Sequence, residues 1–182
     1  PNAYSWGTPT IGAISPSGKM TPNGTQSLTV TNTLVNGLTV GKTVASPVAV
    51  SGQPDQFDVT YNIKVTNSTA SAISYDLTDT FGFDTDIEVV GTPSITKSSN
   101  VSSTVNSGFN GKTSTAIVTG ESIAAATGTP LVPVDETFAV KVRVKVAGFT
   151  ASNNACSGTG TGLFNMVSAK VGGVTRTSSV CT

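Results

Sequence analysis

β-strand alternation assigns Asn32 to an apolar face, and it does the same for three later polar residues: Lys42, Asp79 and Asn165. Each of these three is in phase with the apolar residues of its own segment, which are residues 38–44, 73–81 and 162–173 respectively. Burying a polar group without a partner costs several kcal/mol, and burying an unpaired charge costs more. We therefore expect the three side chains to meet inside the protein.

An amine, a carboxylic acid and a carboxamide that meet in an apolar core can react with one another. Desolvation disfavours the charge on a buried Lys, and the neutral amine is a nucleophile. The same burial favours the protonated form of an Asp, which can then polarise the carbonyl of an Asn. Attack of Lys42 on Asn165, promoted by Asp79, would release ammonia and leave an isopeptide bond. This is a single-turnover reaction of the protein on itself, so we do not expect an enzyme that acts on an external substrate.

Each of the three residues also has an ordinary interpretation. A strand Lys can direct its amine to the surface. An Asp before Thr can cap a turn, and an Asn near a strand end can close a turn or a bulge. For any one residue the structural role is the simpler interpretation, and only the combination indicates the bond.

Segments with an apolar residue at every second position predict the strands that would position these residues. The strongest segments are 56–67, 73–81, 137–149 and 162–173, and weaker ones are 87–91, 94–101 and 113–120. Clusters of Gly, Pro, Asn and Ser separate them at short intervals. We expect an all-β fold, an immunoglobulin-like antiparallel sandwich with an extra N-terminal β segment. Only residues 121–128 could form a turn or two of helix.

The strands divide the chain into two unequal parts. Residues 37–182 carry enough strands for a complete sandwich. Residues 1–36 carry two or three strands, which is too little for a core of their own. This first part is either the C-terminal strands of a preceding immunoglobulin-like domain or a segment that donates a strand elsewhere.

Composition excludes several classes of function. The chain has no His, which removes the commonest general base and metal ligand, so we expect no metal site and no cofactor. Its ten basic and ten acidic residues balance, which gives no attraction for nucleic acid or an anionic membrane. No apolar run reaches the length of about 18 residues that membrane insertion requires. A Ser- and Thr-rich chain with 11% charged residues is typical of secreted surface proteins.

Cys156 and Cys181 are the only cysteines. An even count in exposed-looking loop sequence indicates one disulfide between them. The alternative is two free, buried thiols.

Four segments together resemble a known family: LTVGKTV, FDVTYNIKVTN, YDLTDTF and GLFNMVSAKV. They are similar to the tandem-repeat domains of Gram-positive surface proteins, which are related to isopeptide-forming domains of the collagen-adhesin B type and of pilins. The resemblance covers residues 38–182. It implies that Lys42 is the amine, Asn165 the acceptor and Asp79 the catalyst. The earlier segment SLTVTNTLV resembles the last strand of such a domain, which makes Asn32 a possible second acceptor, either unbonded or cross-linked to another chain.

These observations predict an extracellular structural domain of a stalk, fibre or adhesin, on a bacterial surface or secreted. Its expected partners are neighbouring domains or subunits of the same surface fibre. One alternative is a self-assembling fibre or pilus subunit that uses residues 1–36 for strand donation. Another is a ligand-binding adhesin module, although one Trp and three Tyr offer no aromatic cluster for a site.

Overall fold

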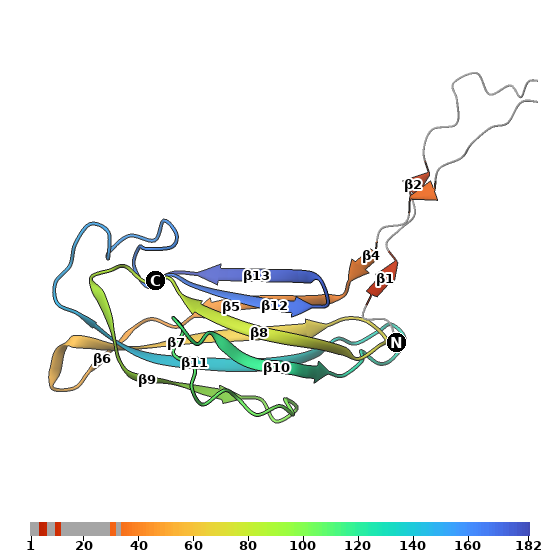
Figure 1. Cartoon of the computed structure of the whole chain (residues 1–182), viewed down its shortest axis with the longest axis horizontal. Coiled ribbons are helices and arrows are strands. Elements are labelled where there is room, and N and C mark those ends of the chain that lie inside the picture. Colours follow the sequence, from red (N-terminus) through yellow and green to blue (C-terminus); the bar gives the residue numbers. More distant parts are fainter. Residues whose placement is uncertain (1–3, 7–9, 12–29, 32–33) are drawn as a thin grey trace, which may run out of the picture.

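Alternating apolar residues build two sheets whose inner faces share one core. The computed structural model describes residues 4–6, 10–11, 30–31 and 34–182, and this part of the chain contains strands but no helix. The main strands form two antiparallel sheets packed as a sandwich (Figure 1). The predicted all-β sandwich is therefore confirmed, and the arrangement is compatible with an immunoglobulin-like fold.

Each sheet pairs its strands antiparallel. One sheet has the order β5 (Leu38–Val44), β7 (Gln53–Asn67), β11 (Val134–Val146) and β9 (Ile87–Lys97), and β6 (Val48–Val50) also pairs with β7. The other has the order β10 (Ala116–Ile123), β8 (Ile73–Phe81), β12 (Asn165–Val171) and β13 (Val174–Val180).

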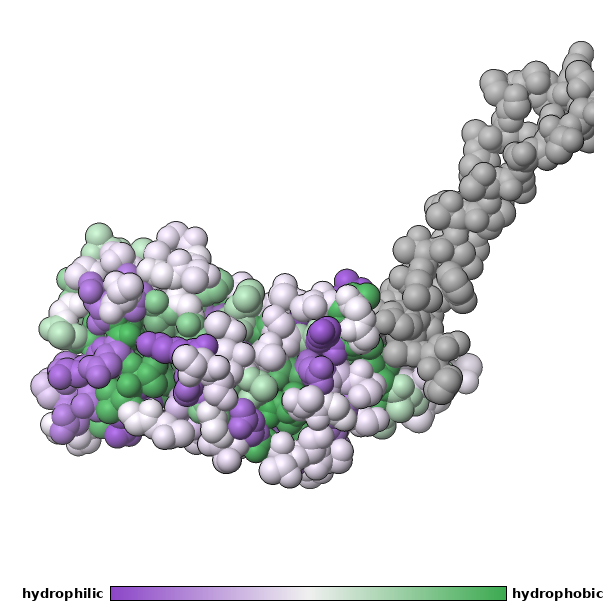
Figure 2. All heavy atoms as spheres, in the orientation of Figure 1, coloured by the Kyte–Doolittle hydropathy of each residue, from purple (hydrophilic) through white to green (hydrophobic). Residues whose placement is uncertain are grey.

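The core follows the alternation of the sequence. On β8, over residues 59–67 of β7 and over residues 136–144 of β11, every second side chain is buried, including Val59, Tyr61, Leu77, Val140 and Val142. The outer surface is different: Figure 2 shows weakly polar residues over most of the visible face, with strongly hydrophilic residues in a few clusters.

Two expectations about elements are wrong. Residues 121–123 end strand β10 instead of starting a helix, because pairing with β8 buries Glu121 and Ile123. The predicted strand at 162–173 has other bounds: β12 begins only at Asn165 and ends at Val171, and a further strand, β13, follows it. The sequence of β13 has Val at both ends and polar residues between them, so alternation did not reveal it.

The first and last strands of the sandwich meet at one side. Strand β5 is the edge of its sheet, and it lies beside β13 and β12 of the other sheet (Figure 1). A side chain on β5 that points inward therefore reaches the strand that carries Asn165.

Four short strands precede the sandwich. Strand β1 (Tyr4–Trp6) pairs with β4 (Leu34–Asn36), and β2 (Thr10–Ile11) pairs with β3 (Val30–Thr31). Within the described residues, these strands pair only with one another.

Candidate functional site

The three residues expected to meet come from three strands and from both sheets. Lys42 lies on β5, Asp79 on β8 and Asn165 at the first position of β12. In the β8–β12 ladder Asp79 faces Val167 and Asn165 faces Phe81, so Asp79 and Asn165 are diagonal neighbours on the inner face. Lys42 reaches them from the opposite sheet.

The carboxyl group of Asp79 holds both partners, one on each oxygen. Lys42 Nζ donates a hydrogen bond to Oδ1 of Asp79, and Asn165 Nδ2 donates one to Oδ2 at 3.0 Å. The side chains of Lys42 and Asp79 and the whole of Asn165 have 0% exposure. One acid thus brings the amine and the carboxamide together in a site closed to solvent.

One aromatic ring lies beside the amine of this site: Lys42 Nζ is 5.1 Å from the centre of the Tyr61 ring. The Tyr61 ring in turn lies near Phe81 and Phe83, with ring centres 6.4 and 6.3 Å away. Phe81 stacks on Phe83 with ring centres 4.8 Å apart, and Phe109 meets Phe81 edge-on at 5.7 Å. Tyr61 therefore joins the site to an aromatic cluster of the core.

Burial shifts the pKa of Lys42 and the pKa of Asp79 in the directions that favour the neutral form of each side chain. Desolvation lowers the pKa of Lys42, although the charge and hydrogen bond of Asp79 oppose this. Desolvation raises the pKa of Asp79, against the smaller opposing effects of Lys42 and Asn165. A neutral amine beside a protonated acid is the combination that nucleophilic attack on an amide requires.

The carbonyl oxygen of Asn165 is buried and lacks a hydrogen-bond partner among the described residues. A buried acceptor of this kind costs about 1–3 kcal/mol. Rotating the carboxamide by half a turn exchanges its oxygen and nitrogen with almost no change of shape. The oxygen then faces Oδ2 of Asp79, and a protonated Asp79 can donate to it and polarise the carbonyl.

The arrangement supports one balanced reaction. In it, the bond from Lys42 Nζ to Asn165 Cγ would form, and the bond from Cγ to Nδ2 would break. One proton would pass from Nζ to the departing nitrogen. Asp79 can relay this proton in the carboxamide orientation that the structure shows, in which its two oxygens contact Nζ and Nδ2. Ammonia would leave, the new amide would carry no charge, and Asp79 would end as it began.

Tyr61 contributes a contact that alternation could not predict. Its hydroxyl donates to the carbonyl oxygen of Leu163 at 2.8 Å. Leu163 comes two residues before Asn165, so the hydroxyl fixes the chain where it enters β12. Burial raises the pKa of Tyr61, which keeps the hydroxyl a donor.

A second buried polar cluster contains two glutamates. Tyr75 donates to Glu136 Oε2 at 2.6 Å, and the backbone N–H groups of Ser102 and Ser103 donate to Glu121 at 3.0 and 2.6 Å. Glu136 is in phase with Phe138 and Val140, and Glu121 is in phase with Ile123, so alternation could have revealed both. The cluster holds no amine and offers no cross-linking chemistry.

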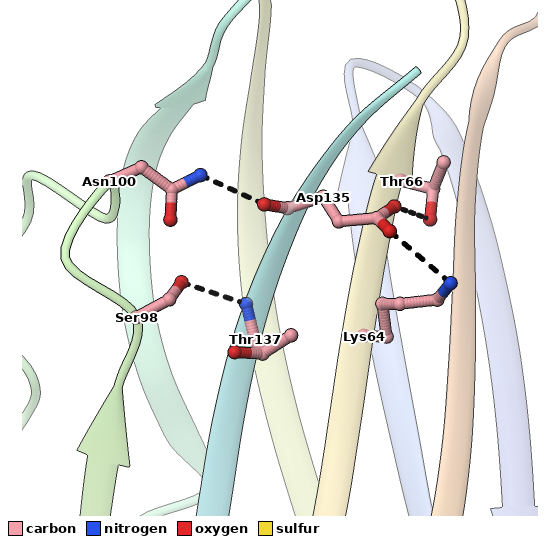
Figure 3. Close-up of polar contacts among 6 residues, drawn as sticks. All are labelled: Lys64, Thr66, Ser98, Asn100, Asp135 and Thr137. Carbon is pink, nitrogen blue, oxygen red and sulfur yellow. Dashed lines mark hydrogen bonds and ion pairs between the residues drawn. The ribbon is translucent and has the colours of Figure 1, made fainter. Parts of the chain in front are cut away.

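The outer face of the β5–β7–β11 sheet shows what an ordinary Lys–Asp pair looks like. Lys64 Nζ lies 3.3 Å from Asp135, and their side chains are 58% and 44% exposed (Figure 3). Thr66 and Asn100 also bond to Asp135. Solvent screens such a pair, whereas the Lys42–Asp79 pair is enclosed.

The remaining predicted residues lie elsewhere. Cys156 and Cys181 form a disulfide, with their Cα atoms 5.6 Å apart. Asn32 falls outside the described residues. No group of three or more His, Cys, Asp or Glu in the described chain is placed to hold a metal ion.

No family model, curated protein or solved structure matches this chain. The part of the chain that the structure describes contains no helix long and apolar enough to cross a membrane.

Proposed function

We propose that this chain is an extracellular structural domain of a stalk, fibre or adhesin, on a bacterial surface or secreted, and that a self-formed isopeptide bond joins Lys42 to Asn165. One observation carries the proposal: a buried carboxyl group holds an amine and a carboxamide on its two oxygens. An unreacted buried ion pair adds little stability, and apolar residues of similar volume often do better. A covalent bond would explain why Lys42, Asp79 and Asn165 are buried together.

The bond would change how the domain resists force and heat. It closes a loop of more than a hundred residues, which stabilises by about 5 kcal/mol in the chain-entropy account. Its two ends lie on β5 and β12, strands of different sheets. A pull on the chain ends would then load covalent bonds instead of the hydrogen bonds between those strands.

The test is the intact mass of the reduced protein. We expect a mass about 17 Da below the sequence value, because the attack of the amine expels one ammonia. Lys42→Met, which keeps an apolar stem, and Asp79→Ala should each restore the full mass. Lys64→Ala is the matched control: it removes the exposed strand Lys, and the loss of ammonia should persist.

An unshifted mass in the wild type would mean that Lys42 and Asn165 form no isopeptide bond. Lys42, Asp79 and Asn165 would then be a hydrogen-bonded cluster. A doubled mass under denaturing conditions would instead indicate a bond between chains and favour the fibre-subunit alternative.

A further inference from the structure

The disulfide lies at the end of the sandwich where Asn165 begins strand β12. In the β12–β13 ladder Asn165 pairs with Val180, the residue next to Cys181. The loop that the disulfide closes runs from Cys156 to Cys181 and therefore contains Asn165. Figure 1 shows the C-terminal end of the chain beside the start of β12. The disulfide is thus a close neighbour of the proposed acceptor.

The residue two positions before Asn165 is held on both sides of its backbone. The N–H of Leu163 donates to the carbonyl oxygen of Thr182 at 3.1 Å, and its carbonyl oxygen accepts from the Tyr61 hydroxyl at 2.8 Å. Thr182 directly follows Cys181, beyond the end of β13. The disulfide is therefore the covalent link that keeps Thr182 beside Leu163.

Gly162 packs closely against both sides of this closed loop. A Cβ atom at Gly162 would lie 2.3 Å from the carbonyl oxygen of Ala155. It would also lie 3.2 Å from Sγ of Cys181 and 3.2 Å from the carbonyl oxygen of Thr182. The residues beside the two cysteines therefore contact the chain that leads into Asn165.

Other contacts of this entry segment come from inside the sandwich. Gly82 and Asp84, just after β8, each donate a backbone hydrogen bond of 2.9 Å to it. These bonds do not involve the disulfide, so Asn165 should stay in the core without it. The bond from Leu163 to Thr182, in contrast, ends next to a cysteine. Loss of the disulfide should therefore loosen the acceptor without releasing it.

A small molecule in solution can reach the disulfide but not the reactive site. Cys156 is exposed and Cys181 is half-buried. Lys42, Asp79 and Asn165 are enclosed. A soluble thiol or disulfide can therefore change the redox state of the cysteines without entering the site.

We propose that the Cys156–Cys181 disulfide positions Asn165 for attack by Lys42, so that oxidation of the two thiols speeds formation of the isopeptide bond. The inference rests on the proposed function. In the oxidation, the two thiols give up two protons and two electrons to one glutathione disulfide, which becomes two glutathione thiols. The new S–S bond then fixes Thr182 beside the chain that enters β12. Because disulfides form in oxidising surroundings, the isopeptide bond would form fastest after export.

The test compares the rate of ammonia loss in the oxidised and reduced states of one sequence. The chain is captured in urea during a short pulse of synthesis, purified unfolded, and refolded by dilution with glutathione disulfide or with reduced glutathione. Circular dichroism shows when the fold is complete. Intact mass then follows the loss of about 17 Da for the isopeptide bond and about 2 Da for the disulfide. The oxidised protein should lose ammonia at least about tenfold faster, because small misplacements cost large factors in rate.

Two controls separate positioning from general stabilisation. A disulfide that only stabilised the fold would not change the rate once folding is complete in both states. The double variant Cys156→Ser/Cys181→Ser should react like the reduced wild type under both conditions. Adding glutathione disulfide to the reduced, folded wild type should restore the fast rate.

Gly162→Ala tests the contact itself while the disulfide is in place. Its added methyl group meets Ala155 and Thr182, so the oxidised variant should react about as slowly as the reduced wild type. Gly160→Ala is the matched control. Both glycines have a left-handed φ, +47° and +86°, but a Cβ atom at Gly160 meets nothing within 4 Å. The oxidised Gly160→Ala variant should therefore react like the oxidised wild type.

Equal rates in the oxidised and reduced wild type, with the fold complete in both, would overturn this inference and leave the isopeptide bond intact. Equal rates in the oxidised Gly162→Ala and Gly160→Ala variants would also overturn it, because the contact with Thr182 would then be irrelevant. Absence of ammonia loss in every state would overturn the isopeptide bond itself. The failure of this inference and the failure of the proposed function are therefore distinguishable.

Discussion

At the scale of single residues, the reaction would remove the cost that burial imposes on Lys42. Before reaction the core holds a Lys and an Asp whose charged forms are both disfavoured by desolvation. After reaction the amine is an uncharged amide and Asp79 can stay protonated. The burial that makes the unreacted pair costly would therefore also favour the bond.

Tyr61→Phe should slow bond formation without preventing it. The change removes the hydroxyl that holds the carbonyl of Leu163 and leaves the ring beside Lys42. The chain entering β12 would then position Asn165 less firmly, and small misplacements cost large factors in rate. The measurement is the fraction of ammonia-loss mass at intervals after a pulse of synthesis.

Tyr75→Phe is the matched control, since it also removes a buried hydroxyl, but one bonded to Glu136. Its time course should follow the wild type even if its melting temperature falls. Equal slowing in both variants would show that general destabilisation, and not positioning, sets the rate.

Alternation alone could place Lys42, Asp79 and Asn165 on inner faces, because side chains of a strand point to two sides in turn. It could not place Tyr61 against Leu163, because alternation assigns a side chain to a face and does not say which backbone atom its hydroxyl meets. The glutamates obeyed the same alternation as the three site residues. Their role lies in packing and hydrogen bonding, which residue type alone does not indicate.

At the scale of elements, two buried glutamates hold neighbouring segments together by hydrogen bonds, and their pKa values shift in opposite directions. Burial raises the pKa of Glu136, although the Tyr75 hydrogen bond opposes it. Burial would also raise the pKa of Glu121, but hydrogen bonds from Ser103 and Ser102 outweigh it and lower the pKa to about 2. Glu121 thereby secures the connection between β9 and β10.

These shifts predict opposite effects for the two Gln variants. Glu136 contributes stability below its unfolded pKa near 4.5 and loses it as pH rises through the raised folded value, so Glu136→Gln should raise the melting temperature at pH 8. Glu121 contributes stability above 4.5 that disappears as pH falls towards 2. Glu121→Gln should therefore cost about 1–3 kcal/mol at pH 8 and little at pH 2.

Thermal unfolding between pH 2 and pH 8 measures both effects. Changes of the same sign at pH 8 would contradict the opposite pKa shifts of the two glutamates.

Most of the long strands were predictable because one face of each is apolar. Strand β13 was not, because it is a sheet edge with largely exposed polar residues and no apolar face to detect. The helix expected at 121–128 is absent for a different reason. Three consecutive alanines favour a helix locally, but pairing of residues 121–123 with β8 decides the outcome.

At the scale of the whole molecule, the proposed bond and the disulfide would together define a covalent route for force. The chain between Lys42 and Cys156 would be excluded from the load. From Asn165 to Cys181 two routes exist: sixteen residues through β12 and β13 (181 − 165), or nine residues back to Cys156 (165 − 156) and across the disulfide. The shorter route limits the extension.

Reduction of the disulfide should therefore lengthen the stretched domain by a small, defined amount. Seven more residues become extensible (16 − 9), which adds about 25 Å at about 3.5 Å per residue. Single-molecule pulling with and without reductant measures this increment. Lys42→Met should instead release the strands from β5 to β12 and give a far longer extension. A reductant-independent length in the wild type would contradict the proposed route.

The most direct test of the central claim is peptide mapping of the reduced protein after trypsin digestion. The isopeptide bond predicts one branched species that joins residues 20–64, uncleaved at Lys42, to residues 146–170, which contain Asn165, with one ammonia lost. Fragmentation should place the branch at Lys42 and Asn165. Recovery of residues 20–42 and 146–170 as separate, unmodified peptides would contradict the account. A loss of ammonia confined to residues 20–64 would identify Asn32 as the acceptor instead.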